Sequence, residues 1–403
     1  MSHTSIFITA GEHTSDCGYC SQEDSSHSYG LFAHTLTCKD YQHMINRGWR
    51  RSGTYVYKPN LRETCCRQYT IRLIAKDFQY TKKNRKIINR LNRYVNGEYV
   101  PEKLKTQTNQ PSEAKRNDGT TSEKSPKEDL IEAIHSIDHH SASTAHKFEV
   151  KLEPASYTEE KYQLYRKYQI TVHHDEPEKI SKSTFKRFLI ESPMELEKTE
   201  NSAFLGFGSF HQSYFLDGKL IAVGVIDILP TSVSSVYFFY DPEYGYLALG
   251  KYSALREIAL TLELNQLIPS IQYYMMGYYI HTCSKMKYKG EYKPSELLDP
   301  ITYEWAPFDK CTSLLNKNKY TLFVPNANGT YEDISSTEAM PGMLDPESIA
   351  DRDLEKMIVC IGGKFVSASI LVKVFPKAKE DIKQHAAAIG IELANRSVLY
   401  YQG

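Results

Sequence analysis

Four cysteines have a spacing that could hold a metal ion. Cys17 and Cys20 frame a Cys-Gly-Tyr-Cys turn, and Cys65 and Cys66 form a second group further along the chain. A Cys-x-x-Cys turn lets two thiolates reach one metal. Adjacent cysteines point to opposite sides of a regular strand, so Cys65 and Cys66 could share an ion only if the strand bends or bulges there. Four thiolates would suit zinc or an iron-sulfur cluster, and ordinary buried or redox-active thiols are the alternative.

The other reactive residue types do not form a comparable set. Four further cysteines are isolated and are expected in the core, because free cysteine behaves as a small apolar side chain: Cys38, Cys283, Cys311 and Cys360. His173-His174-Asp175 could bind a metal or relay protons, although polar loop histidines usually do neither. We find no Ser/His/Asp triad signature.

The stretch from residue 211 to residue 280 predicts the scaffold of a cleft. Asp217-Gly218 supplies the positive φ angles of a type I′ hairpin turn, and prolines at 230 and 242 end two strands. Apolar residues at helical spacing follow. The predicted elements are strands at 213–216, 219–229, 232–240 and 270–280, with a helix at 251–264. An α+β fold with a mixed sheet and a crossover helix is expected.

Weaker patterns extend this scaffold on both sides. Strand character is expected at 55–73, 148–152 and within 357–374, and helices at 81–94, 127–137, 159–168 and within 377–394.

Basic residues are concentrated in one part of a chain whose formal net charge is zero. Between Arg47 and Lys105 there are sixteen Lys/Arg and four Asp/Glu, a local surplus of twelve positive charges. The helix at 81–94 places apolar residues on one side and Lys/Arg on the others. This asymmetry indicates a polyanionic partner such as RNA, and a solvated basic face without a ligand is the alternative.

The composition predicts four units: a Cys-rich, basic N-terminal domain (1–100), a flexible polar linker (101–146), a domain that holds the mixed sheet (147–315) and a C-terminal extension (316–403). The N-terminus has no secretory signal pattern, and the longest apolar run is far too short to span a bilayer. We therefore expect a cytoplasmic or nuclear protein without a membrane partner.

Several long motifs resemble the arginyl-tRNA-protein transferases. The first half carries Trp49-Arg50-Arg51-Ser52-Gly53, Tyr57-Lys58-Pro59 and Thr64-Cys65-Cys66-Arg67-Gln68-Tyr69. The second half carries matches at 208–212, 217–224, 227–230, 234–237, 240–242, 249–250, 252–257 and 286–290. The resemblance covers most of residues 15 to 311 apart from the linker and its flanks. It implies an acetyltransferase-like (GNAT) catalytic fold.

The resemblance also implies a reaction. Members of this family move arginine from arginyl-tRNA to the α-amine of proteins beginning with Asp, Glu or oxidised Cys, which marks those proteins for degradation. An aminoacyl ester is already activated, so positioning a neutral amine against it should supply much of the acceleration. A weak base or proton relay then suffices.

Candidate catalytic residues follow from this chemistry. Asp241, beside a proline-induced strand end, could orient or deprotonate an ammonium group, or simply cap the turn. His211 and Gln212 could contact the peptide or the arginine carried by the tRNA, and buried polar packing is the alternative for Gln212. Tyr240 precedes Asp241 in the shared motif and is expected to contact substrate.

Acceptor selection requires a cation for the acidic first side chain. Four residues are candidates: Arg62, Arg67, Lys287 and Lys289. Each could instead contact a tRNA phosphate or face solvent. If the four cysteines share a metal, that site could shape the acceptor pocket or report redox state.

Two other functions are compatible with these patterns. A non-catalytic module could bind tRNA or acidic N-termini through the basic segment, with steep salt dependence. An acetyl-CoA-dependent acetyltransferase would need a Gly/Arg-rich turn before a helix, and Leu249-Gly250-Lys251 is a poor version of such a turn.

Overall fold

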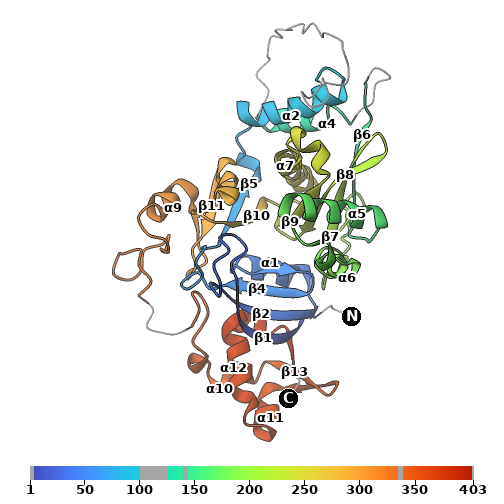
Figure 1. Cartoon of the computed structure of the whole chain (residues 1–403). Helices are drawn as coiled ribbons and strands as arrows, with labels where there is room; N and C mark the ends of the chain where they lie inside the picture. Colours follow the sequence, from blue (N-terminus) through green and yellow to red (C-terminus); the bar gives the residue numbers. More distant parts are fainter. Residues whose placement is uncertain (1–3, 100–125, 139–143, 335–338, 402–403) are drawn as a thin grey trace.

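A computed structural model describes residues 4–99, 126–138, 144–334 and 339–401 of the 403-residue chain. Two β-sheets with helices packed on them make up these residues, so the expected α+β class is confirmed (Figure 1). None of the helices in these ranges combines the length and apolar character needed to cross a bilayer.

The larger sheet has eight strands in the order β12-β11-β5-β10-β9-β8-β7-β6. Their bounds are β5 (Tyr69–Ile74), β6 (Phe148–Pro154), β7 (Gly208–Leu216), β8 (Lys219–Ile228), β9 (Ser232–Tyr240), β10 (Tyr273–Tyr279), β11 (Ser295–Leu298) and β12 (Trp305–Pro307). All neighbouring pairs are antiparallel except β9 and β10, which run parallel. The crossover between β9 and β10 is the predicted helix.

The predicted hairpin and crossover are confirmed. Asp217 and Gly218 have φ angles of 52° and 81°, as a type I′ turn between β7 and β8 requires. The crossover helix α7 (Leu249–Leu267) is longer than the predicted helix at both ends. Its apolar residues lie on nearly all sides, because α7 is packed against β9 and β10 on one side and under α2 and α4 on the other.

Helices cover both faces of this sheet (Figure 1). On one face α2 (Lys82–Val95) and α4 (Pro126–His135) lie outside α7, and their apolar residues share its core. On the other face α5 (Glu159–Tyr168) and α6 (Lys182–Phe185) pack against β8 and β9. Shorter helices follow β10 and β12, namely α8 (Ser284–Lys287) and α9 (Phe308–Leu315).

The smaller sheet combines the beginning of the chain with residues far along it. Its seven strands run in the order β14-β13-β15-β1-β2-β4-β3. They are β1 (Ile6–Ser15), β2 (Ser26–Thr35), β3 (Arg50–Ser52), β4 (Tyr55–Pro59), β13 (Ile358–Ile361), β14 (Lys364–Ser367) and β15 (Val398–Tyr400). Its helices are α1 (Cys38–Ile45), α10 (Asp351–Leu354), α11 (Ala368–Val374), α12 (Ala378–Ile389) and α13 (Ile391–Ala394).

The sheets do not follow the predicted unit boundaries. β5 comes from the predicted N-terminal domain but lies in the eight-stranded sheet, and β13 to β15 come from the predicted C-terminal extension but complete the seven-stranded sheet. The division of the chain into four domains therefore remains a prediction. Most of the predicted linker lies outside the described residues, and the helix expected at 127–137 corresponds to α4.

A buried ion pair joins the two sheets. Arg51 of β3 donates from Nε and Nη2 to the Asp227 carboxylate of β8 at 2.9 and 2.5 Å, and from Nη2 to Ser209 of β7 at 3.0 Å. Asp227 is fully buried and the Arg51 side chain is 3% exposed. Next to it, Gly53 has a φ of 62°, and a Cβ there would lie 1.9 Å from the Arg187 carbonyl oxygen. Close packing at this junction thus depends on a residue without a side chain.

Asp227→Asn should strongly destabilise the fold. The substitution leaves the buried Arg51 without its counter-charge, a change that typically costs about 3–5 kcal/mol. Chemical denaturation measures the loss. Asp309→Asn, which breaks the exposed pair with Lys293 at 3.0 Å, is the matched control and should cost at most about 1 kcal/mol. Equal stability of the two variants would contradict the structural role given to Asp227.

Candidate active site

The four predicted metal-ligating cysteines come together. The sulfur atoms of Cys17, Cys20, Cys65 and Cys66 all lie within 4.8 Å of one another, and Cys20 Sγ and Cys65 Sγ are 3.4 Å apart. None of the four is in a disulfide. Tetrahedral zinc with Zn–S bonds of about 2.3 Å places its thiolates about 3.8 Å apart, so the set fits one metal ion.

Two loops position these thiols. The first is the turn after β1, which is closed by hydrogen bonds from Cys17 N to Gln22 O and from Ser21 N to Cys17 O. The second connects β4 to β5, and Cys65 N donates to Ser25 O. The single strand pattern expected at 55–73 is therefore two strands with the cysteines between them. The chain bends at Cys65-Cys66, which is the condition for both to face one ion.

The cluster is polar on one side and apolar on the other. Ser25 Oγ donates to Cys65 Sγ at 3.1 Å. Burial raises the pKa of Cys65, but hydrogen bonds from Ser25 and the neighbouring thiols outweigh it and bring the pKa to about 7. Ile280 and Met286, which follow β10, pack on the apolar side. Cys283 packs there too and is half-exposed, so the expectation that it is an isolated core residue is wrong. Cys38, Cys311 and Cys360 are buried as expected.

A fork in the eight-stranded sheet adjoins this cluster. β9 and β10 pair only over Ser232–Ser234 and Tyr273–Met275, and beyond these residues neither strand pairs with the other. The ladder between β8 and β9 contains a bulge at the same level, because Val225 is opposite Tyr237 while Ile226 is opposite Ser235. Val236 is the extra residue. The part of β9 beyond Ser234 thus presents backbone groups without a partner in β10.

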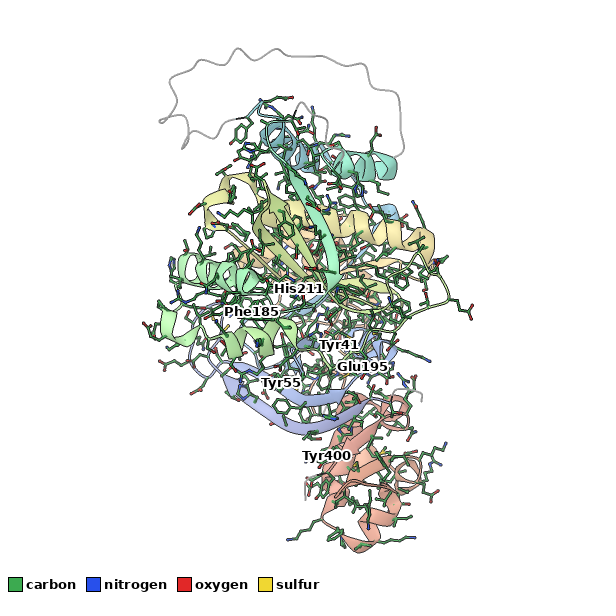
Figure 2. All side chains as sticks on the ribbon, turned by 90° about the vertical axis from the view of Figure 1, so that its right-hand side faces the viewer. Tyr41, Tyr55, Phe185, Glu195, His211 and Tyr400 are labelled. Carbon is green, nitrogen blue, oxygen red and sulfur yellow. The ribbon has the colours of Figure 1, made fainter. Side chains whose placement is uncertain are left out.

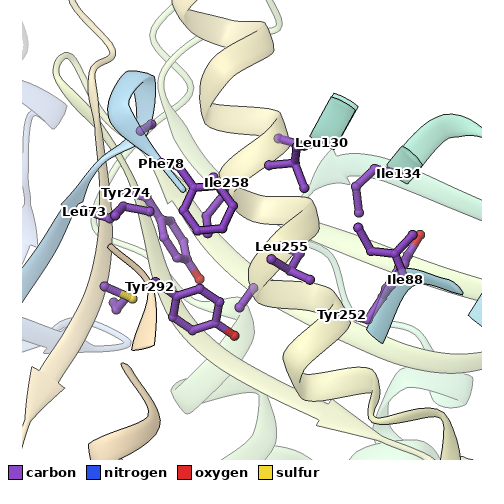
Figure 3. Packing of buried hydrophobic residues seen from close by; sticks show 14 of the residues in the cluster. Leu73, Phe78, Ile88, Leu130, Ile134, Tyr252, Leu255, Ile258, Tyr274 and Tyr292 are labelled. Atoms are coloured by element: carbon purple, nitrogen blue, oxygen red, sulfur yellow. The ribbon is translucent and has the colours of Figure 1, made fainter. Parts of the chain in front are cut away.

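Glu257 of α7 links the two arms where they separate. Its carboxylate accepts hydrogen bonds from Tyr274 Oη of β10 at 2.7 Å and from Ser253 Oγ at 2.8 Å. Glu257 is 1% exposed. Burial raises its pKa above the ordinary value, although hydrogen bonds from Tyr274, Ser253 and Ser235 of β9 oppose the shift. Figure 3 shows Tyr274 and Tyr292 together beside α7.

Cations close the other side of the fork. Successive arginines of β3 reach different strands of the larger sheet, since Arg51 binds Asp227 of β8 whereas Arg50 Nη2 donates to the Gly277 carbonyl of β10 at 3.2 Å. Lys289 Nζ donates to the next carbonyl, that of Tyr278, at 2.8 Å. Burial, with Arg50 nearby, lowers the pKa of Lys289 to about 7. Thiols, a buried carboxyl group and two cations therefore surround one forked strand pair.

Family models match both halves of the chain. The arginine-tRNA-protein transferase N-terminus model matches residues 15–86, and the C-terminus model matches residues 160–299. The chain is 32% identical to arginyl-tRNA–protein transferase 1 of Arabidopsis thaliana, over 87% of this chain and 80% of the relative. The chain belongs to the arginyl-tRNA–protein transferase family. The resemblance expected from its motifs is confirmed.

Further relatives carry two different names. Arginyl-tRNA–protein transferase 1 of Drosophila melanogaster is 35% identical, over 78% of this chain and 85% of the relative. The aspartate/glutamate leucyltransferase of Campylobacter jejuni is 25% identical, over 63% of this chain and 78% of that protein. Within the arginyl-tRNA–protein transferase family, the cysteine loops lie in the part matched by the N-terminus model, and the fork lies in the part matched by the C-terminus model.

Asp241 is held in place by ionic and capping interactions. Its carboxylate is bonded to Lys167 at 2.7 Å and to Lys219 at 2.9 Å, and it accepts the Glu243 N–H at 3.1 Å. Although burial raises the pKa of Asp241, these three groups lower it below the ordinary value. A carboxylate of lowered pKa is a weak base, so the geometry favours the capping role over deprotonation. Tyr240 is half-buried and its ring lies 5.1 Å from that of Tyr168.

His211 and Gln212 point to opposite faces of β7. Figure 2 shows His211 inside the molecule, where Nε2 donates to the Leu189 carbonyl at 3.1 Å. Burial and the nearby Lys161 lower its pKa to about 4, which keeps the ring neutral at pH 7. Gln212 faces α7 and accepts a hydrogen bond from Tyr214 Oη at 2.5 Å. Their predicted substrate contacts remain predictions, and the structure does not bring the two side chains together.

The predicted anion-binding residues differ in their surroundings. Arg62 donates to Asp333 at 2.7 and 3.1 Å, so its charge is largely neutralised within the protein. Arg67 donates to the Arg62 and Glu63 carbonyls, beside the cysteine loop. Lys287 is exposed on α8, and Lys289 is the one of the four that reaches the fork.

Two residues of the fork were not selected from the sequence. Glu257 and Arg50 both occur in motifs shared with the family, but the sequence predicted no role for either side chain. For Glu257 a signal exists, since it interrupts the apolar pattern of α7 at a position whose neighbours Leu255 and Ile258 are fully buried. For Arg50 no local signal distinguishes it from Arg51, because which strand each one reaches depends on long-range packing.

Cys17→Ser should reduce the metal content of the purified protein. The variant removes one of four thiolates, and a serine hydroxyl is a poor ligand for zinc or iron. Elemental analysis and a visible absorption spectrum after anaerobic purification measure the metal and its type. Cys283→Ser, next to the cluster but outside the four-thiol set, is the matched control and should keep its metal. A wild-type protein that carries far less than one metal site per chain would contradict the site.

Proposed function

We propose that this protein transfers arginine from arginyl-tRNA to the α-amine of protein N-termini, and that the acceptors begin with Asp, Glu or oxidised Cys. The observation that carries the proposal is membership of the arginyl-tRNA–protein transferase family, with matches to both family models in order along the chain. The relatives at 27–35% identity are named for arginyl transfer, whereas those named for leucyl transfer are 24–25% identical. That difference supports arginine as the transferred residue.

The eight-stranded sheet supports an acetyltransferase-like (GNAT) catalytic fold. Three features of this sheet support that fold. The sheet is antiparallel with one parallel pair, a crossover helix connects the strands of that pair, and a bulge lies at the point where they separate. We propose that the fork between β9 and β10 receives the aminoacyl ester. The unpaired backbone groups of β9 beyond Ser234 would then be available to the ester carbonyl oxygen.

The chemistry needs one proton acceptor. The α-amine nitrogen attacks the ester carbonyl carbon, a C–N bond forms, and the C–O bond to the terminal ribose breaks as that oxygen takes up a proton. Glu257 is the proposed acceptor of the proton that the amine loses, because its raised pKa makes it a stronger base than an ordinary carboxylate. Its contacts with both arms support this placement.

The basic helix α2 supplies a surface for tRNA. Its buried residues, Ile88 and Leu91 among them, face α7, which leaves the side chains of Lys82, Arg85 and Lys86 exposed. Only part of the predicted basic segment has this character, since Arg50, Arg51 and Lys58 are buried. We propose that α2 contacts phosphates and that the buried cations act elsewhere.

The four-cysteine site is proposed to hold a zinc ion or an iron-sulfur cluster. The mutual sulfur distances favour a single ion over a larger cluster. Such a group would fix the loop after β1 to the loop before β5, and these loops contact the residues that follow β10. The metal is thus proposed to shape the acceptor side of the fork.

Arginine transfer can be measured directly. Purified protein incubated with labelled arginyl-tRNA should label peptides beginning with Asp or Glu and leave peptides beginning with Asn or Gln almost unlabelled. Leucyl-tRNA is the control donor and should be transferred poorly. Salt-sensitive RNA binding without any transfer would contradict the proposal and favour a non-catalytic tRNA-binding module.

Glu257→Gln should separate activity from stability. Gln keeps the size, and its amide oxygen can accept from one of the two hydroxyls while its Nε2 donates to the other, so the fold should form, but transfer should fall by about 100-fold because a proton acceptor is lost. Burial raises the pKa of Glu257 in the folded protein above 4.5, its ordinary value. The free energy of unfolding of the wild type therefore falls as the pH rises from 4.5 to the pKa of the folded state, whereas the variant has no charge to bury. Denaturation at acidic and neutral pH should show the variant gaining relative stability. Unchanged transfer would exclude Glu257 as the base.

A further inference from the structure

The smaller sheet has one packed face and one open face. Phe7 of β1, Val359 of β13 and Leu399 of β15 are buried and share a core with residues of α12. Side chains alternate along a strand, so the residues next to these three face the other way. On that open face Ile358 and Tyr400 are each 37% exposed. Apolar side chains that stay exposed over several strands indicate a binding surface.

A mainly apolar row crosses the strands of the open face. The register places one residue of each of five neighbouring strands in this row, from β14 to β2: Ser367, Ile358, Val398, Ile6 and Thr35. Neighbouring strands lie about 4.8 Å apart, so the row is about 19 Å long. An extended peptide of about six residues has the same length.

A cavity of about 680 Å³ lies on this row. Ile6, Ile358 and Val398 line it from the sheet. Phe365, which is on the edge strand β14, also lines the cavity and is 63% exposed. The volume and the mostly apolar lining are those of cavities that bind ligands.

A segment that precedes β7 forms a wall of the cavity. Pro193, Glu195 and Glu197 line the cavity from this segment. The Pro193 carbonyl accepts from Leu36 N at 2.9 Å, and a carboxylate oxygen of Glu197 accepts from Cys38 N at 2.7 Å. Both donors belong to the chain that follows β2, so the wall is fixed to the sheet. The cavity is therefore formed before any ligand binds, which lowers the cost of binding.

The charges that line the cavity are negative. Glu195 and Glu197 line it, whereas none of its lining residues within the described ranges is a lysine, an arginine or a histidine. The Glu197 carboxylate keeps acceptor positions beyond the one that Cys38 N uses, because a carboxylate has about four. An apolar floor beside carboxylates complements a ligand that has apolar side chains and a positive charge.

We propose that this cavity binds an extended segment of a partner protein in which lysine or arginine stands next to apolar residues. The apolar side chains of that segment would cover Ile358 and Phe365, and its cation would pair with Glu195 and Glu197. The inference does not depend on the proposed function.

The distance to the cysteine loop indicates a partner other than the acceptor. β1 has ten residues and is therefore about 33 Å long. Its first residue, Ile6, lines the cavity, and Cys17 follows its last residue, Ser15. An acceptor terminus near the cysteine loop would need about ten extended residues to reach the cavity. Short acceptor peptides would thus react without touching it.

Selection from a peptide library tests the proposal. Random peptides of about twelve residues are selected on the immobilised full chain, and enriched sequences are synthesised with an acetylated N-terminus, so that they cannot accept arginine. They should carry Lys or Arg beside apolar residues. Phe365→Asp and Glu195→Lys should each weaken their binding at least about 10-fold, measured by fluorescence polarisation. Val374→Asp is the matched control and should bind as wild type, because Val374 is 65% exposed but does not line the cavity.

Several results would overturn the proposal. Enrichment of acidic peptides, of uncharged peptides or of none would do so, as would binding that neither Phe365→Asp nor Glu195→Lys weakens. Competition between the selected peptides and an Asp-initiated acceptor would assign the cavity to the acceptor. A dimer that Phe365→Asp converts to a monomer in sedimentation would make a second copy of the chain the occupant.

Two further measurements separate binding from folding and from catalysis. Phe365 and Glu195 are exposed, so both variants should unfold at the wild-type temperature and transfer arginine to short Asp peptides at the wild-type rate. A chain that binds the selected peptides but transfers nothing would contradict the proposed function and support this inference.

Discussion

The buried ion pair between Arg51 and Asp227 is the contact on which the arrangement of the two sheets depends. Asp227 is in β8 and Arg51 is in the short edge strand β3, so the pair fixes the smaller sheet to the strand that lies next to β9. Successive residues of a strand point to opposite sides, and Arg50 is thereby directed to β10. The Arg51 pair therefore determines where the charge of Arg50 lies relative to β10.

The sequence predicted the local structure well where periodicity and turn residues were strong. The hairpin at Asp217-Gly218, the strand at 232–240 and the helix at 159–168 agree with the structure. It did not predict which sheet each strand joins. β5 follows the cysteine loop, yet it pairs with β10 and β11, whose residues lie some two hundred positions away. Such pairings depend on packing between distant segments, which no local pattern records.

The candidate site was predictable in the same uneven way. The cysteine set was predicted because metal ligation requires a particular residue type, and because the Cys-x-x-Cys spacing is visible in the sequence itself. Asp241 was selected for its position at a strand end, but two lysines and a backbone N–H occupy its carboxylate. Glu257 and Arg50 depend on burial for their properties. Burial is a consequence of the whole fold, so it could not be read from the residues themselves.

The position of β15 has a consequence for how the molecule is assembled in the cell. This strand, residues 398–400, lies between β13 and β1 and pairs in parallel with both. During synthesis the ribosome releases β1 long before β15, so the first strand must wait until residues 398–400 have been made before its neighbour arrives. Until then one edge of the β1–β2 hairpin is exposed, and the loop with Cys17 and Cys20 connects two strands of an incomplete sheet. Chaperone protection of nascent chains would matter most during this interval.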